Sequence, residues 1–333
     1  MPEAFLRIGT RTVAVAVFLL LIAGALVTST QSGLAVPDWP LSYGKVMPPM
    51  VGGILYEHGH RLVAAAVSTL VGLELGALLL LLKGRKTVKV LAAAAFFAIL
   101  LQALLGGLTV LFLLPPAVSS AHAALAEIVF ALTAVVALMC SKTWEDLAAL
   151  RAVAPTSTGL AARPGSLPLE ENPRSFSSKD EGVRAAFRWT VLATAAIYVQ
   201  ILLGAVMRHT GAGLAIPDFP TFFGSWLPAF SDLSRPGVPI HLAHRLGATV
   251  VILVVAKAAT ELAKLEVPLL ATAGAGWAGL VCLQAILGAT SIWSGKAVPL
   301  TVAHLAVGAL CWVTGVLASV ALAAGFSDKL GRD

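Results

Sequence analysis

The stretch Glu57-His58-Gly59-His60-Arg61 leads directly into a long apolar run, Leu62 to Leu82, and this combination decides the fold. A second copy, His241-Leu242-Ala243-His244-Arg245, stands 184 residues later and again leads into an apolar run. His60-Arg61 therefore matches His244-Arg245. A motif that recurs at a fixed offset indicates an internal repeat.

Two more histidines, His122 and His304, stand near the beginning of later apolar runs. Each lies 20 residues beyond a matching Gln-Ala-(Leu/Ile)-Leu-Gly segment, which runs from Gln102 to Gly106 and from Gln284 to Gly288. We therefore predict a tandem repeat in which each half contributes two intramembrane histidines.

The composition excludes an ordinary soluble domain. Apolar residues make up 58% of the chain and charged residues 12%, about half of the usual charged share. The three cysteines lie far apart in apolar runs and give no CxxC metal site. The net charge of +6 arises from basic residues near the ends of the apolar runs, so it predicts membrane topology and lipid contact, and no nucleic-acid partner.

A membrane-spanning helix needs roughly 20 mostly apolar residues. We expect such helices at approximately 12–30, 56–82, 88–112, 119–141, 186–208, 239–263, 267–292 and 299–324. The predicted fold is an all-α polytopic membrane protein of eight transmembrane helices, arranged as two tandem-repeated four-helix bundles. The bundles are expected at 1–141 and 185–333. The segment 142–184, rich in Pro, Ser, Arg and acidic residues, is expected to be a cytoplasmic linker, a flexible tether.

Alternate assignment of the loops places seventeen of the 23 basic residues on one side of the membrane. The positive-inside rule then predicts a multi-pass protein of the cell membrane with both termini in the cytoplasm. The two long outer loops repeat as well, since Ser32 to Pro40 matches Ala212 to Pro220. Their Gly, Pro, Asp and aromatic residues indicate a folded segment at the membrane interface. It either covers a site at the outer helix ends or serves folding alone.

The four histidines are candidate ligands of haem iron. A lone histidine in an apolar helix is usually a hydrogen-bonded packing residue, but His60, His122, His244 and His304 occupy matching repeat positions near the outer ends of their spans. Two imidazoles from two helices of a four-helix bundle are a common way to hold a haem axially. Small residues around them leave room for a flat macrocycle, although they also permit close helix packing. Copper or zinc is an alternative, although the sequence has no tightly spaced cluster of three ligands for such an ion.

Arg61 and Arg245 directly follow two of these histidines. A guanidinium pairs well with a carboxylate, so haem propionates are candidate partners, and snorkelling to lipid phosphate is the alternative. Three residues before the ligand candidate, the first half has Glu57 and the second has His241. Because positions three apart share a helix face, we expect Glu57 to face whatever His60 binds, and to serve there as a proton relay or charge stabiliser.

Other polar residues have no assigned chemistry. His58 and His209 lack a repeat partner and are interpreted as interfacial polar residues. Glu74 and Glu127 are acids within apolar runs, and the pattern suggests no role for them.

Together these residues resemble the haem A synthase family. The resemblance rests on the two Gly-Leu-Ala-x-Pro-Asp-(Trp/Phe)-Pro loops, on Glu57-His58-Gly59-His60-Arg61, on Arg208-His209-Thr210-Gly211-Ala212-Gly213 and on the four repeated histidines. It covers both halves and omits the central segment. It implies an enzyme, a haem O oxidoreductase that oxidises a ring methyl group of haem O to a formyl group, giving haem A for haem-copper oxidases.

The resemblance also implies roles for individual residues. His60 and His122 would flank the substrate haem O in the N-terminal half, with Glu57 important for turnover. His244 and His304 would ligate a haem b cofactor in the C-terminal half. The implied partners are an external electron donor, the farnesyltransferase that produces haem O, and the machinery that assembles terminal oxidases.

In one respect the chain departs from the family. Many members have a cysteine pair in the outer loops, whereas this chain has Val36 and Ser42 in that part of the first loop and Ile216 in the second. A loop disulfide is therefore excluded. The reaction would be successive hydroxylation of the methyl group followed by loss of water, or electron withdrawal followed by attack of water.

Two rival functions remain open. A di-haem b electron carrier would need the same histidines and arginines, but it gives no reason for the exchange of Glu57 for His241. A transporter is the other possibility, and inverted repeats are common in that class. Here each half has an even number of spans, so the halves share one orientation.

Overall fold

The computed structural model describes residues 2–153 and 173–330 and is built from helices. Eight of them are long and apolar enough to cross a membrane, so the chain is a multi-pass all-α membrane protein, as the sequence predicts. Their bounds are α1 Pro2–Ser29, α2 Gly53–Leu81, α3 Lys86–Leu111, α4 Pro116–Met139, α6 Pro173–His209, α7 Val238–Ala263, α8 Pro268–Trp293 and α9 Val298–Leu330. Helices dominate because a lipid-facing backbone must satisfy its hydrogen bonds within its own segment.

Proline and glycine set several of the helix ends. Pro116 and Pro268 occupy the first turns of α4 and α8, where no backbone N–H is needed. Gly237 precedes α7 with φ 79°, a left-handed conformation that glycine adopts without steric cost.

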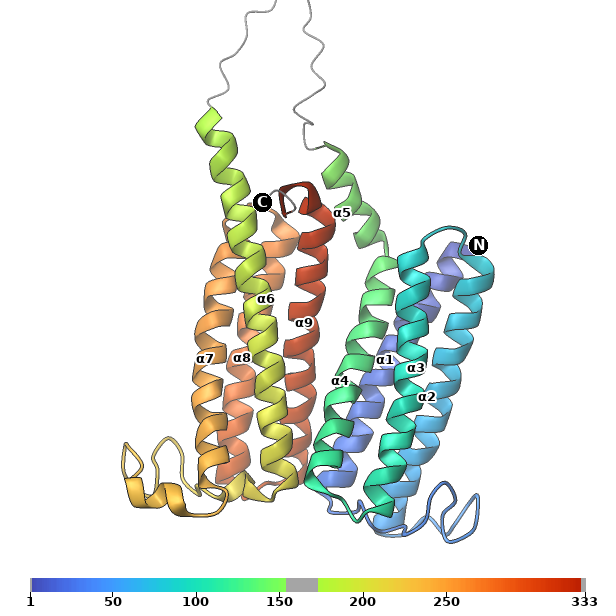
Figure 1. Ribbon diagram of the computed structural model, residues 1–333, viewed down its shortest axis with the longest axis vertical. Helices are drawn as coiled ribbons and strands as arrows, with labels where there is room; N and C mark the ends of the chain where they lie inside the picture. The colour runs from blue at the N-terminus through green and yellow to red at the C-terminus, as the bar shows by residue number, and fades with distance from the viewer. Residues whose placement is uncertain (1, 154–172, 331–333) are drawn as a thin grey trace, which may run out of the picture.

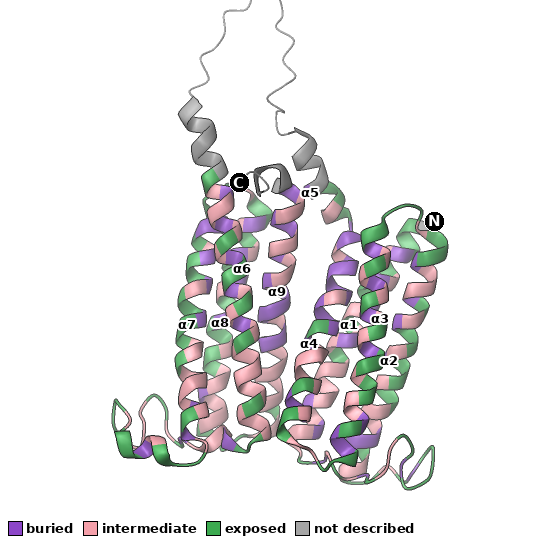
Figure 2. Ribbon diagram, in the orientation of Figure 1, coloured by how far each residue is buried: buried purple, intermediate pink, exposed green. Residues whose placement is uncertain are grey.

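The spanning helices form two groups of four (Figure 1). In the first group α1 packs on α2, α2 on α3, α3 on α4 and α4 on α1; in the second, α6 to α9 pack in the same cyclic order. The groups meet through α4 and α9, with further contacts of α1 with α9 and of α4 with α6. Residues buried inside the protein make up 44% of the apolar window of α4 and 50% of that of α9, against at most 28% for the other six spans. Figure 2 shows this concentration of buried residues on α9.

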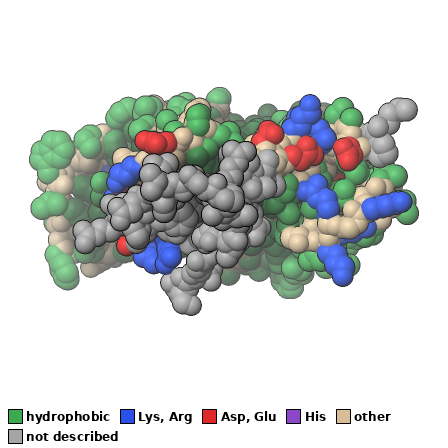
Figure 3. Space-filling view, turned by 90° about the horizontal axis from the view of Figure 1, so that it is seen from above, with side chains coloured by type: hydrophobic (Ala, Val, Ile, Leu, Met, Phe, Trp, Pro, Cys, Tyr) green, Lys and Arg blue, Asp and Glu red, His purple; other side chains and the backbone are tan. Residues whose placement is uncertain are grey.

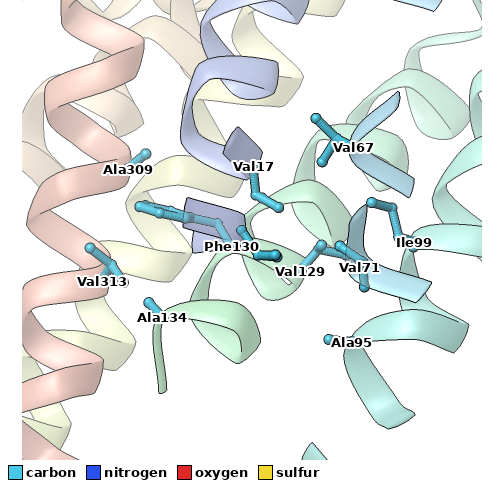
Figure 4. Close-up of a cluster of buried hydrophobic side chains, with 11 residues drawn as sticks. Val17, Val67, Val71, Ala95, Ile99, Val129, Phe130, Ala134, Ala309 and Val313 are labelled. Carbon is cyan, nitrogen blue, oxygen red and sulfur yellow. The ribbon is translucent and has the colours of Figure 1, made fainter. Parts of the chain in front are cut away.

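A hydrophobic cluster joins the two groups. Phe130 of α4 extends toward Ala309 and Val313 of α9, while Val17 of α1 lies beside it (Figure 4). Phe130 also stacks on Phe18 of α1, with 5.4 Å between the ring centroids. This packing makes α9 part of the core of the first group as well as of its own.

The two ends of the helices differ in character. The termini and the short helix α5, Lys142–Val153, lie at one end, and the long loops after α1 and α6 lie at the other (Figure 1). Lysine, arginine and acidic side chains gather at the end that carries the termini (Figure 3). Helical structure extends into the segment expected to be a linker from both sides, through α5 and the first turns of α6. The rest of that segment, 154–172, lies outside the described residues.

Candidate functional site

The four candidate histidines lie on diagonally opposed helices. His60 is on α2 and His122 on α4, and His244 is on α7 and His304 on α9. Among the extensively packed pairs of described helices, neither α2–α4 nor α7–α9 occurs. Each histidine stands about two turns inside the end of its helix that adjoins the long loops. Each bundle therefore has one histidine on each side of its axis at a similar depth.

A glycine on a neighbouring helix makes room for each imidazole. A Cβ atom at the glycine would lie 3.0 to 3.2 Å from Cε1 of the ring, closer than ordinary van der Waals contact. The pairs are Gly24 with His60, Gly106 with His122, Gly204 with His244 and Gly288 with His304. The Cε1 edge of each ring thus points at helix backbone, and any side chain at the glycine would press on the ring.

Three of the four rings also have a glutamine beside them. The glutamine Nε2 atom lies near a ring nitrogen, at 3.4 Å for Gln102–His122, 3.1 Å for Gln200–His244 and 3.3 Å for Gln284–His304. Gln102 and Gln200 also donate to the backbone carbonyl of the same histidine, at 2.8 and 2.7 Å. In the sequence, Gln102 and Gln284 are visible only as markers of the repeat. The spacing Gln-x-x-x-Gly also occurs on α6, at Gln200 and Gly204. This shared spacing is the sequence signal that could have identified all three glutamines as neighbours of the histidines.

Unpaired polar atoms indicate that these rings bind something further. Nδ1 of His60 and of His122 is buried without a hydrogen-bond partner, and so is Oε1 of all three glutamines. Such atoms are costly to bury unless a ligand or a small rearrangement satisfies them. Within residues 2–153 and 173–330, no three His, Cys, Asp or Glu side chains gather into a metal site. Paired imidazoles across a four-helix bundle fit haem iron. The glutamine atom beside each ring is Nε2, a donor, so the unused Oε1 accepts the N–H of an iron-bound imidazole only after the amide turns over.

Glu57 and His241 perform the same structural task in their two halves. Glu57 is buried, and its Oε2 accepts a hydrogen bond from the backbone N–H of Val36 at 2.7 Å. His241 is buried, and its Nδ1 accepts from the backbone N–H of Ile216 at 3.3 Å. The sequence predicts that Glu57 faces whatever His60 binds. The structure adds a second role, because the Glu57 carboxylate binds the backbone of the outer loop. Glu57 and His241 thus accept equivalent backbone N–H groups. The difference between the halves is that a carboxylate stands at this position in the first half and an imidazole in the second.

The two arginines also bind the loops. Arg61 forms an ion pair with Glu57 at 2.6 Å and donates to the carbonyls of Asp38 and Leu41. Arg245 has no acidic counterpart at position 241, and it donates to three carbonyls, those of Ile216, Asp218 and Thr221. Its Nε is buried without an acceptor. The Nε–H of Arg245, the residue that follows His244, is therefore the donor available to a haem propionate.

An aspartate folds each outer loop into the same turn. Asp38 accepts hydrogen bonds from the backbone N–H groups of Tyr43 and Gly44, and this lowers its pKa. Asp218 is bonded in the same way by Phe223 and Gly224. Desolvation opposes ionisation of Asp218, but these bonds and one from its neighbouring threonine together lower its pKa to about 2. Short isolated bridges, Ser42–Lys45 and Phe222–Ser225, close the two turns.

Aromatic side chains attach both loops to the helix ends. The indole of Trp39 lies against Gly107 of α3, and Phe219 meets Trp293 of α8 edge to face with ring centroids 6.1 Å apart. The loops therefore cover the ends of the bundles that carry the histidines, which favours the expected covering role.

His58, interpreted from the sequence as an interfacial polar residue, lies near the loop end of α2. It is buried, and its Nδ1 lies 2.7 Å from the Ser42 hydroxyl, so it is a further loop contact. Arg208, the neighbour of His209 on α6, reaches across the interface between the bundles. It donates to Ser29 of α1 at 2.6 Å, and Ser29 also accepts from Thr301 of α9 at 3.1 Å.

The two intramembrane acids lie away from these contacts. Glu74 and Glu127 are buried, and each has a carboxyl oxygen without a partner. Cys140, Cys282 and Cys311 are all free thiols.

Comparison with known proteins identifies the family. Residues 10–316 match the model of a family described as cytochrome oxidase assembly protein. The chain is 32% identical over 250 residues to a protein named heme A synthase from Halalkalibacterium halodurans, covering 74% of this chain and 72% of that one. A heme A synthase from Shouchella clausii is 31% identical over 252 residues, with the same two coverages. One from Geobacillus thermodenitrificans is 27% identical over 306 residues, covering 88% of this chain and 84% of that protein.

Proposed function

The chain belongs to the cytochrome oxidase assembly protein family, and from that premise we propose that it is a haem A synthase. It is an oxidoreductase that converts haem O to haem A by oxidising a ring methyl group to a formyl group. The single observation that best supports this is the pair of diagonal histidines in each bundle, each ring lying against a glycine. Paired axial ligands suit a haem, and two pairs suit a substrate haem and a cofactor haem.

The halves have different tasks in this proposal. The N-terminal bundle, 1–141, binds haem O between His60 and His122. The C-terminal bundle, 185–333, binds haem b between His244 and His304. The charge difference supports this division: Arg61 forms an ion pair with Glu57. Among the described residues Arg245 forms no ion pair, the Asp218 carboxylate acts on it only at longer range, and its Nε is left for a propionate.

The residues of this chain position and shield the porphyrin, while the bound haem supplies the redox chemistry. The four histidines would hold the porphyrin, the glycines leave room for their imidazoles, and the outer loops cover the bundle ends. Glu57 lies one turn from His60 and carries the carboxylate closest in sequence to the substrate ligand. In the proposal it takes up or relays protons released as the methyl group is oxidised.

Topology and partners complete the proposal. The basic residues at the end that carries the termini support a cell-membrane protein with both termini in the cytoplasm. Haem O would come from the farnesyltransferase that makes it, haem A would pass to the terminal oxidase assembly machinery, and electrons would pass to or from an external carrier.

The test is chromatography with mass analysis of haems extracted from membranes of a haem O-producing host, with and without this chain. We expect haem A or its hydroxylated precursor only where the chain is expressed. Unchanged haem O beside bound haem b would contradict the proposal and favour a di-haem electron carrier.

Single ligand variants test the division of tasks. His244→Ala and His304→Ala should each remove a low-spin haem b spectrum from the purified protein. Retention of that spectrum in both variants would place the cofactor elsewhere.

A further inference from the structure

One of the four imidazoles lacks the amide partner that the other three share. On α3, α6 and α8 the glycine that contacts the ring is preceded four residues earlier by a glutamine, which reaches that ring. On α1 the glycine is Gly24, and the residue four positions earlier is Leu20. The side chain of Leu20 can neither donate nor accept a hydrogen bond.

The facing helix changes together with this position. In the second half Gln200 packs directly against Gly247, three residues after His244. The residue three positions after His60 is Val63. The positions that hold glutamine and glycine in the second half therefore hold leucine and valine in the first. Neither leucine nor valine offers the ring a hydrogen bond.

The consequence for His60 is a ring held by packing alone. It lies against Gly24 as the other rings lie against their glycines, so its location is equivalent. Its Nδ1 is buried without a partner, and no hydrogen bond to its ring occurs within the described residues. A partner on the second nitrogen orients a ligating imidazole and raises its basicity, and its loss typically weakens metal binding by about 10- to 100-fold.

We propose that His60 is the exchangeable axial ligand of the haem in the N-terminal bundle, and that Gln102, Gln200 and Gln284 are positioning residues that keep the other three imidazoles attached. This inference rests on the proposed function. It places the coordination site that can open on the α2 side of the substrate porphyrin. Glu57 stands on that same helix, one turn before His60.

The test uses the purified, haem-loaded protein reduced with dithionite, with carbon monoxide as the probe of an open iron position. The same spectrum of the His244→Ala protein, which is expected to lack haem b, assigns the bound carbon monoxide to one bundle. We expect carbon monoxide to bind to the haem of the N-terminal bundle and not to the haem of the C-terminal bundle. The variant Leu20→Gln/Val63→Gly rebuilds the second-half arrangement around His60. It should weaken carbon monoxide binding by about tenfold or more.

The converse variant, Gln200→Leu/Gly247→Val, should open the second haem to carbon monoxide, and it keeps the test available if the first variant does not fold. The inference is overturned if the wild-type protein excludes carbon monoxide from both haems. It is equally overturned if the Leu20→Gln/Val63→Gly variant binds carbon monoxide with wild-type affinity. These readouts need no turnover. Failure of the proposed function would instead appear as absence of haem O and haem A from the extracted pigment.

Discussion

Replacement of Glu57 separates a structural role from a chemical one. Both carboxylate oxygens are engaged: one accepts the buried N–H of Val36 at 2.7 Å and the other pairs with Arg61 at 2.6 Å. Glu57→Ala removes both contacts. An unsatisfied buried N–H costs about 1–3 kcal/mol, and breaking a buried ion pair costs about 3–5 kcal/mol. Because Arg61 keeps its bonds to loop carbonyls, we expect a loss near the lower end of the sum of these two costs, about 4 kcal/mol.

Glu57→His is the matched control, because His241 occupies the equivalent position and accepts the equivalent N–H. This variant retains the loop contact, as the second half does beside Arg245, and we expect its stability to fall by about 1 kcal/mol, the net value of one hydrogen bond. Its carboxylate is nevertheless gone. If that carboxylate takes part in the oxidation, Glu57→His should fold and bind haem but give no haem A.

The assay combines thermal unfolding of the purified protein, the haem-to-protein ratio and the haem A content of the membranes. We expect both variants to lose product, and only Glu57→Ala to lose about 4 kcal/mol of stability. Wild-type haem A yield from Glu57→His would refute a chemical role. Glu57 would then be a loop-holding residue only.

Three further predictions follow from the contacts. Gly204→Ala places a Cβ 3.0 Å from the adjoining imidazole and should reduce haem b content by about tenfold, whereas Gly279→Ala, with nothing within 4 Å, should leave it unchanged; equal haem content in both variants would contradict the assigned ring position. The pKa of Asp218 is about 2 in the folded loop, below its ordinary value of 3.8, so its contribution to loop order is present above pH 4 and lost as the pH falls toward 2. Hydrogen exchange of the two amides that bond its carboxylate should stay slow from pH 7 to about 4, and fast exchange already at pH 5 would exclude this anchoring. Arg208→Ala and Ser29→Ala, combined in a double-mutant cycle of unfolding, should show coupling of about 1–2 kcal/mol across the bundle interface, and strict additivity would exclude it.

The membrane class and the number of spans could be predicted from the amino-acid sequence alone. Each span is specified by the length and hydrophobicity of its own residues, whichever helices pack against it. The predicted spans agree with the eight helices to within a few residues at most ends, apart from the long beginnings of α1 and α6. The sequence also selected the four histidines, since their repeat offset is visible without a structure.

The neighbours of those histidines are visible only in the folded protein. That Glu57, Arg61 and Arg245 bind the outer loops depends on where a distant segment folds back, and spacing along one helix cannot show this. The glycine behind each ring and the glutamine beside three of them lie on other helices, up to 44 residues away. Such contacts are set by which helices pack together and at what depth. Leu20 and Gln200 occupy equivalent positions, each four residues before the glycine that contacts a histidine ring. Only the helix packing shows that this position lies beside the ring, and hence that His60 lacks an amide neighbour.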